Sequence, residues 1–77
     1  MEFTYEQVKK YLEFHLENIA GWKKDKKLQE RFYNEAYGVV DFILRLSDET
    51  NDKTLSQKVC DLWNGEMMPK MAKKIWG

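Results

Sequence analysis

One long amphipathic stretch, residues 25–46, constrains the fold of this chain more than any other part of the sequence. Its apolar residues recur at steps of three and four, the period of one α-helical face. They form two adjacent rows: Leu28, Phe32, Ala36, Val39, Ile43 and Leu46, and then Tyr33, Tyr37, Val40 and Leu44. The rows, with Phe42 at one margin, cover an arc of roughly 220°, whereas a surface helix needs a stripe of little more than ~100°. The sequence therefore predicts a central helix that is covered from two sides, by neighbours in a bundle or at a subunit interface.

A second helix is predicted before the central one, over residues 4–20. Its apolar stripe is Tyr5, Val8, Leu12, Leu16 and Ile19. Thr4 and Gln7 have the spacing of a capping box. In this motif each side chain accepts a hydrogen bond from the backbone N–H of the other residue. Gly21 suits the end of this helix, and Asp25 suits the start of the next.

The remaining helices are predicted after a polar turn at residues 47–53. Thr54 and Gln57 repeat the capping-box spacing at the start of a helix over residues 54–64, whose buried face is Leu55, Val59, Leu62 and Trp63. Asn64-Gly65 is a stop signal, and Pro69 suits the first turn of a short fourth helix that runs through residue 76. Its predicted packing residues are Met68, Ala72, Ile75 and Trp76. The expected fold is all-α: a small three-helix bundle with a long central helix and a short fourth C-terminal helix.

Length and composition restrict the class of protein. Seventy-seven residues make a single domain, residues 1–77, near the lower size limit for one hydrophobic core. Thirteen basic and thirteen acidic side chains cancel, so net charge predicts no polyionic partner. One cysteine excludes an internal disulfide and, with no signal-peptide pattern and no apolar run of membrane-spanning length, favours a cytoplasmic protein without membrane insertion.

The residues able to carry chemistry do not form a catalytic or metal-binding pattern. His15 is the only histidine, and we expect it at the boundary of the core with a local hydrogen bond. Cys60 has no base at a recognisable spacing, so a small buried side chain is favoured over a reactive thiol. Glu13 and Glu17 lie on the predicted solvated face. The sequence therefore predicts no enzyme, no metal and no cofactor.

Aromatic residues are more numerous than one small core can bury. Four Phe, four Tyr and three Trp make up 14% of the chain, and Phe14 lies off the stripe of its helix. Clustered exposed aromatics mark interaction surfaces, although single exposed aromatics are ordinary. The candidate partner-binding residues are Tyr11, Phe14, Tyr33, Tyr37 and Trp76.

Two lysine clusters favour an alternative function. The connection WKKDKK supplies candidate phosphate contacts at Lys23, Lys24, Lys26 and Lys27, because lysine and tryptophan together can bind phosphates and stack a base. The same pattern also occurs in surface loops whose tryptophan packs into the core. Residues 54–76 can further be interpreted as a helix-turn-helix whose second helix carries Lys70, Lys73 and Lys74.

These observations favour a small cytoplasmic protein-interaction module of regulatory, accessory or inhibitor type. Compact proteins of this size are common among such classes, including those of phages and mobile elements, which is an analogy from size alone. The expected partner is another macromolecule or a second copy, with a homodimer through the aromatic face of the central helix slightly favoured. The alternative is a nucleic-acid-binding helical regulator that uses the two lysine clusters.

Overall fold

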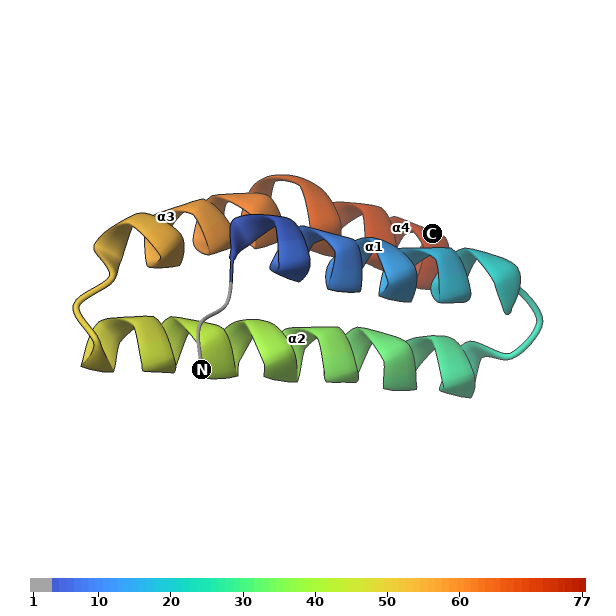
Figure 1. Cartoon of the computed structure of the whole chain (residues 1–77). Coiled ribbons are helices and arrows are strands. Elements are labelled where there is room, and N and C mark those ends of the chain that lie inside the picture. The colour runs from blue at the N-terminus through green and yellow to red at the C-terminus, as the bar shows by residue number, and fades with distance from the viewer. Residues whose placement is uncertain (1–3) are drawn as a thin grey trace.

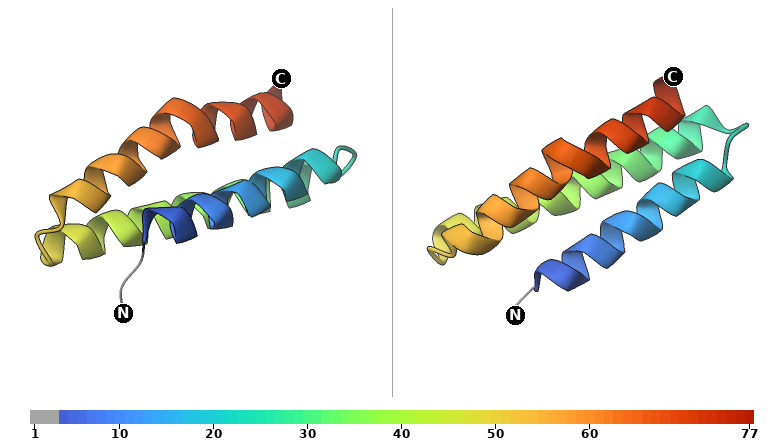
Figure 2. Two further views of the ribbon diagram at one scale, coloured as in Figure 1. Left: turned by 45° about the horizontal axis from the view of Figure 1, so that its top comes forward. Right: turned by 90° about the horizontal axis from the view of Figure 1, so that it is seen from above.

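The computed structural model describes residues 4–77 and has the predicted all-α architecture of three helical rods (Figure 1). The first rod is α1 (Tyr5–Gly21) and the second is α2 (Lys26–Glu49). The third joins α3 (Lys53–Leu62), a π-helical segment η1 (Trp63–Met67) and α4 (Met68–Trp76) without a break. The α1–α2 connection and the C-terminus lie at one end of the bundle, and the α2–α3 connection lies at the other (Figure 2). Residues 4–77 contain no strand.

The starts of the first two helices follow the sequence prediction. The Thr4 hydroxyl accepts from the Gln7 backbone N–H at 3.2 Å, and the Gln7 side chain accepts from the Thr4 N–H at 3.0 Å. These two bonds complete the capping box and pair backbone donors that have no partner inside the helix. Asp25 accepts from the Leu28 N–H at 3.0 Å and caps α2.

The predicted turn at residues 47–53 is wrong in extent, because α2 continues to Glu49. Ser47 is buried, and only Thr50 to Asp52 connect the two helices. Asn51 adopts a left-handed backbone conformation with φ of 60°, which asparagine tolerates better than most residues. Asp52, rather than Thr54, caps the next helix by accepting from the Leu55 N–H at 3.1 Å.

The predicted stop at Asn64-Gly65 is also wrong, because the chain widens into a π-helix there and continues. The Met68 N–H donates to the Trp63 carbonyl, five residues earlier. Pro69 follows directly; it has no N–H, and in a regular α-helix its ring would clash with the Gly65 carbonyl. The wider π turn accommodates Pro69, and the third rod bends at this point instead of ending (Figure 2).

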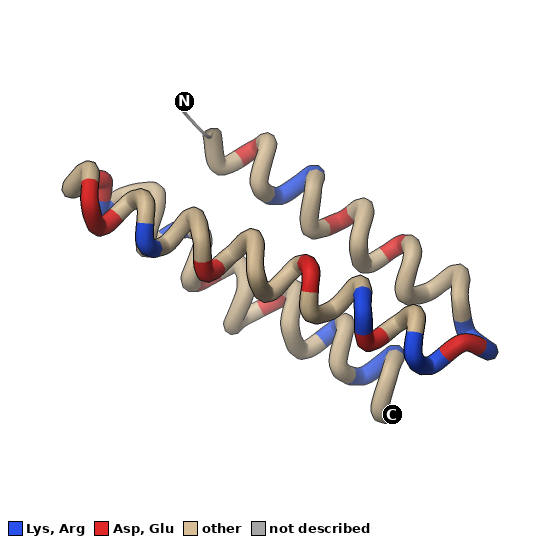
Figure 3. The backbone as a smooth tube through the Cα atoms, turned by 90° about the horizontal axis from the view of Figure 1, so that it is seen from below, with Lys and Arg blue, Asp and Glu red and all other residues tan. Residues whose placement is uncertain are grey.

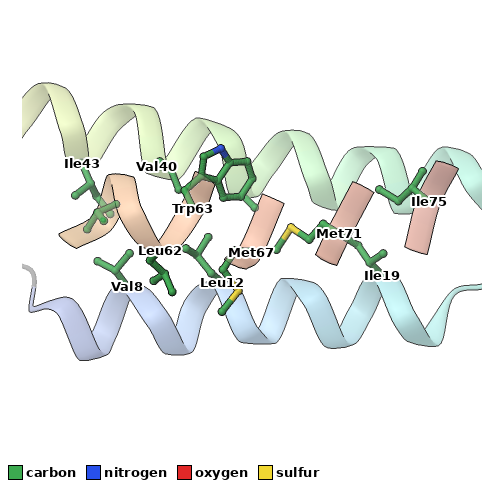
Figure 4. Close-up of a cluster of buried hydrophobic side chains, with 12 residues drawn as sticks. Val8, Leu12, Ile19, Val40, Ile43, Leu62, Trp63, Met67, Met71 and Ile75 are labelled. Atoms are coloured by element: carbon green, nitrogen blue, oxygen red, sulfur yellow. The ribbon is translucent and has the colours of Figure 1, made fainter. Parts of the chain in front are cut away.

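The π turn also keeps the third rod facing the core. Five buried residues follow one another at four-residue steps: Val59, Trp63, Met67, Met71 and Ile75. In a regular α-helix each such step overshoots a full turn by about 40°, so four steps would rotate the row by roughly 160°. One inserted residue turns the row back by roughly 100°. The whole row therefore packs between α1 and α2, where Figure 4 shows its side chains meeting Leu12 and Ile19.

The most buried line of α2 runs between the two predicted rows. Ala36, Val40 and Ile43 are buried, whereas Phe32 and Val39 on one side and Tyr33 and Leu44 on the other are half-buried. α1 covers the Phe32 side, and the third rod covers the Tyr33 side. The prediction of a central helix covered from two sides by its neighbours is confirmed. None of the helices in residues 4–77 is long and apolar enough to cross a membrane.

Candidate interaction site

Most of the aromatic residues predicted to bind a partner are exposed. The exposed fractions are 41% for Tyr11, 60% for Phe14, 55% for Tyr37 and 52% for Trp76. Tyr33 is half-buried. Trp22 and Phe42, which were not among the candidates, are also exposed, at 51% and 54%. The structure divides the five candidates between two surfaces, one on each side of α2.

The first surface surrounds His15 at the junction of α1 and α2. The imidazole ring lies 4.3 Å from the Tyr11 ring, 6.0 Å from the Phe14 ring and 6.0 Å from the Phe32 ring, measured between centroids. The Phe14 and Phe32 rings both meet it edge to face, a favourable arrangement for aromatic pairs. Tyr11 and Phe14 therefore form the exposed cover of a buried histidine.

The local hydrogen bond predicted for His15 is present. Its Nδ1 lies 3.0 Å from the Tyr11 carbonyl oxygen, and its Nε2 lies 3.5 Å from Glu35 Oε2 on α2. The residue is only 3% exposed, so it is buried in the core and not at its boundary as predicted. The Tyr11 contact lies within α1, whereas the Glu35 contact links α1 to α2, so His15 has a structural role at this junction.

The second surface lies between α2 and the third rod. Tyr33 packs on Trp63 with ring centroids 5.7 Å apart and meets Trp76 edge to face at 5.2 Å. Tyr37 meets the Trp63 ring at 6.1 Å. We call these four residues, Tyr33, Tyr37, Trp63 and Trp76, the tyrosine–tryptophan seam. It contains three of the five predicted partner-binding residues, whereas Tyr11 and Phe14 belong to the His15 surface.

The third rod presents an uncharged flank to this seam. The residues that follow each core position at four-residue steps carry no charge: Cys60, Asn64, Met68, Ala72 and Trp76. Trp76 shows that this flank faces α2, because it contacts Tyr33. Met68 and Ala72 are half-buried along it. The seam is therefore continuous with an apolar strip of the third rod.

The opposite flank of the third rod is charged. Among the residues that precede each core position, Lys58, Glu66, Lys70 and Lys74 are charged, and Leu62 is buried. The Lys58 ammonium lies 5.9 Å from the centre of the Tyr5 ring of α1. Lys58 and Glu66 line an open groove with Tyr5 and Glu6. Trp76, the exposed large hydrophobic residue among residues 53–77, thus lies on the side of α2.

Cys60 is half-buried rather than buried as predicted. Its sulfur accepts a hydrogen bond from the Asn64 side-chain amide at 3.2 Å. The neighbouring ion pairs do not involve it, and the histidine belongs to the other surface. We therefore assign Cys60 to the polar edge of the uncharged flank.

The acidic pair Glu13 and Glu17 is exposed on α1, as predicted. Within residues 4–77, no three side chains among His, Cys, Asp and Glu are grouped closely enough to bind a metal ion.

The two lysine clusters come together at one end of the bundle. Lys23, Lys24, Lys26 and Lys27 belong to the α1–α2 connection and the start of α2, and Lys73 and Lys74 to the last turn of α4. Figure 3 shows basic residues gathered at this end, which we call the basic end. Trp22 and Trp76 are exposed there, so this connection is not a surface loop whose tryptophan packs into the core. The helix-turn-helix interpretation of residues 54–76 is wrong too, because no turn separates the two halves.

One residue of the seam, Trp63, and the uncharged flank beside the seam were missed by sequence reasoning. Trp63 was predicted to be buried but not to support exposed tyrosines, and Met68 and Ala72 were assigned to the core. The signal was present in the four-residue spacing of Val59, Trp63, Met67, Met71 and Ile75. A sequence prediction that extended the helix through Gly65 would have placed the uncharged flank beside Tyr33 and Tyr37.

The tyrosine–tryptophan seam is the candidate interaction site. The seam combines exposed aromatic rings, fixed supporting rings and an uncharged strip over α2 and the third rod. The chain matches no protein-family profile, no curated protein and no solved structure.

Proposed function

We propose that this protein is a small protein-interaction module that binds a protein partner through the tyrosine–tryptophan seam. The observation that carries the proposal is the exposure of Tyr37 and Trp76. Each contacts another aromatic ring of the same fold, yet more than half of each side chain remains open to solvent. Large aromatic side chains of this kind dominate the binding energy of protein interfaces.

The seam is suited to binding because its exposed rings have fixed supports. Trp63 is 6% exposed and contacts both tyrosines. Ordering a mobile side chain on binding costs about 0.5–1.5 kcal/mol, and rings that already pack on one another avoid part of that cost. The tyrosine hydroxyls can remain at a wet rim while the rings are covered.

The seam is favoured over the His15 surface because of their surroundings. Tyr11 and Phe14 lie on a helix whose outer face carries Lys10, Glu13 and Glu17. The seam instead adjoins the uncharged flank of the third rod. The centre of a protein interface is typically depleted in charged residues, so the seam is the better candidate for a central contact. The proposed compartment is the cytoplasm, since the single cysteine cannot form an internal disulfide.

Site-specific photocrosslinking in the native host tests this function. A photoreactive phenylalanine analogue replaces Tyr37 in one version of the chain and Phe42 in another. The two positions are matched in exposure, at 55% and 54%, and both lie on α2. We expect a protein adduct from position 37 and little or none from position 42. Equal adducts from both positions, or none from position 37, would contradict the assignment of the seam.

Nucleic-acid binding at the basic end is the second candidate. The observation that favours it is the convergence of two lysine clusters with the exposed rings of Trp22 and Trp76. Positive groups that follow a phosphate backbone and aromatic rings that stack on bases are the two parts of single-strand binding. It ranks second because the chain has no net charge.

Fluorescence anisotropy with single-stranded and duplex DNA tests this alternative. We expect no binding at physiological salt. Micromolar binding that weakens steeply with salt, and that disappears when Lys23, Lys24, Lys26 and Lys27 are replaced by Gln, would promote nucleic-acid binding to first place.

A further inference from the structure

We propose that the occupant of the tyrosine–tryptophan seam is a second copy of this chain, placed antiparallel to the first across a twofold axis near Tyr37. The inference rests on the proposed function, since it names the partner of the same seam. Three features of the molecule support it: the place of Tyr37 along α2, the charges at the two ends, and the area of the long face.

Tyr37 lies at the middle of the molecule. α2 runs from Lys26 to Glu49, so Tyr37 has about as much helix before it as after it. A twofold axis perpendicular to α2 at this residue places Tyr37 against its own copy and aligns the two bundles along their full length. Twofold symmetry of this kind is the commonest in soluble oligomers and uses the same patch on both copies.

The two ends of the bundle carry opposite charge. The basic end has six lysines, from Lys23 to Lys27 and at Lys73 and Lys74, with Asp25 as the carboxylate among them. The opposite end, around the α2–α3 connection, has Asp48, Glu49 and Asp52 with Lys53. An antiparallel pair places the basic end of each copy beside the acidic end of the other. A parallel pair would place like charges together, which costs free energy.

The long face is large enough for a stable dimer. The bundle extends over 41 × 22 × 17 Å. A rectangle that encloses one long face has an area of roughly 700–900 Å², so an interface that buries the ~800 Å² per partner of a standard complex needs nearly the whole face. Contact along the full length of the bundle is required to reach this area, and the antiparallel arrangement provides it.

Sedimentation equilibrium of the full chain tests whether the second copy binds. Wild type is compared with Tyr37→Glu and with the matched control Phe42→Glu, and circular dichroism confirms that helix content is unchanged. We expect a dimer for wild type and for Phe42→Glu. Tyr37→Glu should raise the dissociation constant at least about tenfold, since it places a carboxylate at the centre of the contact. A monomer at all concentrations, or a dimer unaffected by Tyr37→Glu, would overturn the inference.

A distance measurement tests the direction of the pair. A spin label is attached to residue 49 of the full chain in a variant that carries both Glu49→Cys and Cys60→Ser. Residue 49 lies twelve residues beyond Tyr37, so the antiparallel pair separates the two labels by about 36 Å along α2. A parallel pair would bring them within about 20 Å, because packed helix axes lie about 10 Å apart. The short distance would reject the antiparallel arrangement.

The photocrosslinking described above separates this inference from the function on which it rests. An adduct of twice the chain mass at position 37 supports both. An adduct with a different protein at position 37 retains the interaction function but rejects the second copy as occupant.

Discussion

Nε2 of His15 lies 3.5 Å from Oε2 of Glu35, which joins the middle of α1 to the middle of α2. The histidine is almost fully buried, whereas the Glu35 side chain is 46% exposed and also lies 3.5 Å from Arg31 Nε. On its other side the ring meets the Tyr11 carbonyl oxygen at 3.0 Å. A carbonyl oxygen can only accept a hydrogen bond, so a hydrogen bond at this contact requires a proton on Nδ1.

We therefore predict that Nδ1 of His15 is protonated in the folded protein. Long-range proton–nitrogen NMR spectra of uniformly labelled protein report the protonation state of each ring nitrogen. The same spectra in urea, where the contact with Tyr11 is lost, serve as the reference. A folded ring that carries its proton on Nε2 alone would show that the Tyr11 contact is absent in solution.

Ile43→Ala should destabilise the fold strongly. Ile43 is 3% exposed on the buried line of α2, and emptying a buried isoleucine costs about 2–5 kcal/mol. The neighbouring Phe42, which is 54% exposed, is the matched control, and we expect Phe42→Ala to cost much less. Urea unfolding followed by circular dichroism measures both. Equal losses at the two positions would contradict the burial described for α2.

Gln29→Leu should destabilise through a lost hydrogen bond. The Gln29 side-chain amide is buried and donates to the Ile19 carbonyl at 2.7 Å, one of the last carbonyls of α1, which have no partner inside the helix. Leaving that oxygen unpaired costs about 1–3 kcal/mol. The exposed Gln57, which donates to Asp61 at 2.9 Å, is the control. Gln57→Leu should change the free energy of unfolding by less than about 0.5 kcal/mol.

Gly38→Ala should stabilise the protein. Gly38 lies in the middle of α2, and a Cβ atom added there meets nothing within 4 Å. Alanine is favoured over glycine inside a helix by roughly 0.5–1 kcal/mol. Thermal unfolding should show a higher midpoint for the variant. A lower midpoint would indicate that another molecule approaches α2 at Gly38.

Asn51→Ala should have the opposite effect. Asn51 has a positive φ of 60° in the α2–α3 connection, and a left-handed conformation costs a residue such as alanine roughly 1–2 kcal/mol. Asn51→Gly restores the freedom of that backbone and is the matched variant. We expect a lower unfolding midpoint for Asn51→Ala than for Asn51→Gly, and equal midpoints would contradict the conformation of this turn.

Local patterns in the sequence determined the helices, most of their starts and much of the core. The capping box of Thr4 and Gln7, the cap at Asp25 and the stripes of α1 and α2 need only interactions within a turn or two of helix, so spacing alone predicts them. The same reasoning predicted a local hydrogen bond for His15 and exposure for Phe14. It also identified Tyr33, Tyr37 and Trp76 among five candidate partner-binding residues, without separating them from Tyr11 and Phe14.

The tertiary structure decided whether the third rod ends or continues. Asn64-Gly65 favours a turn locally, but Met67, Met71 and Ile75 gain burial only when the helix continues past them between α1 and α2. The π turn reconciles that packing with Pro69 and with the four-residue spacing of the core row. Packing also decided that Tyr33 lies beside Trp63 and Trp76, that Glu35 meets His15, and that two lysine clusters far apart in sequence share one end. Such relationships depend on how whole helices face one another, and helix periodicity alone does not contain that information.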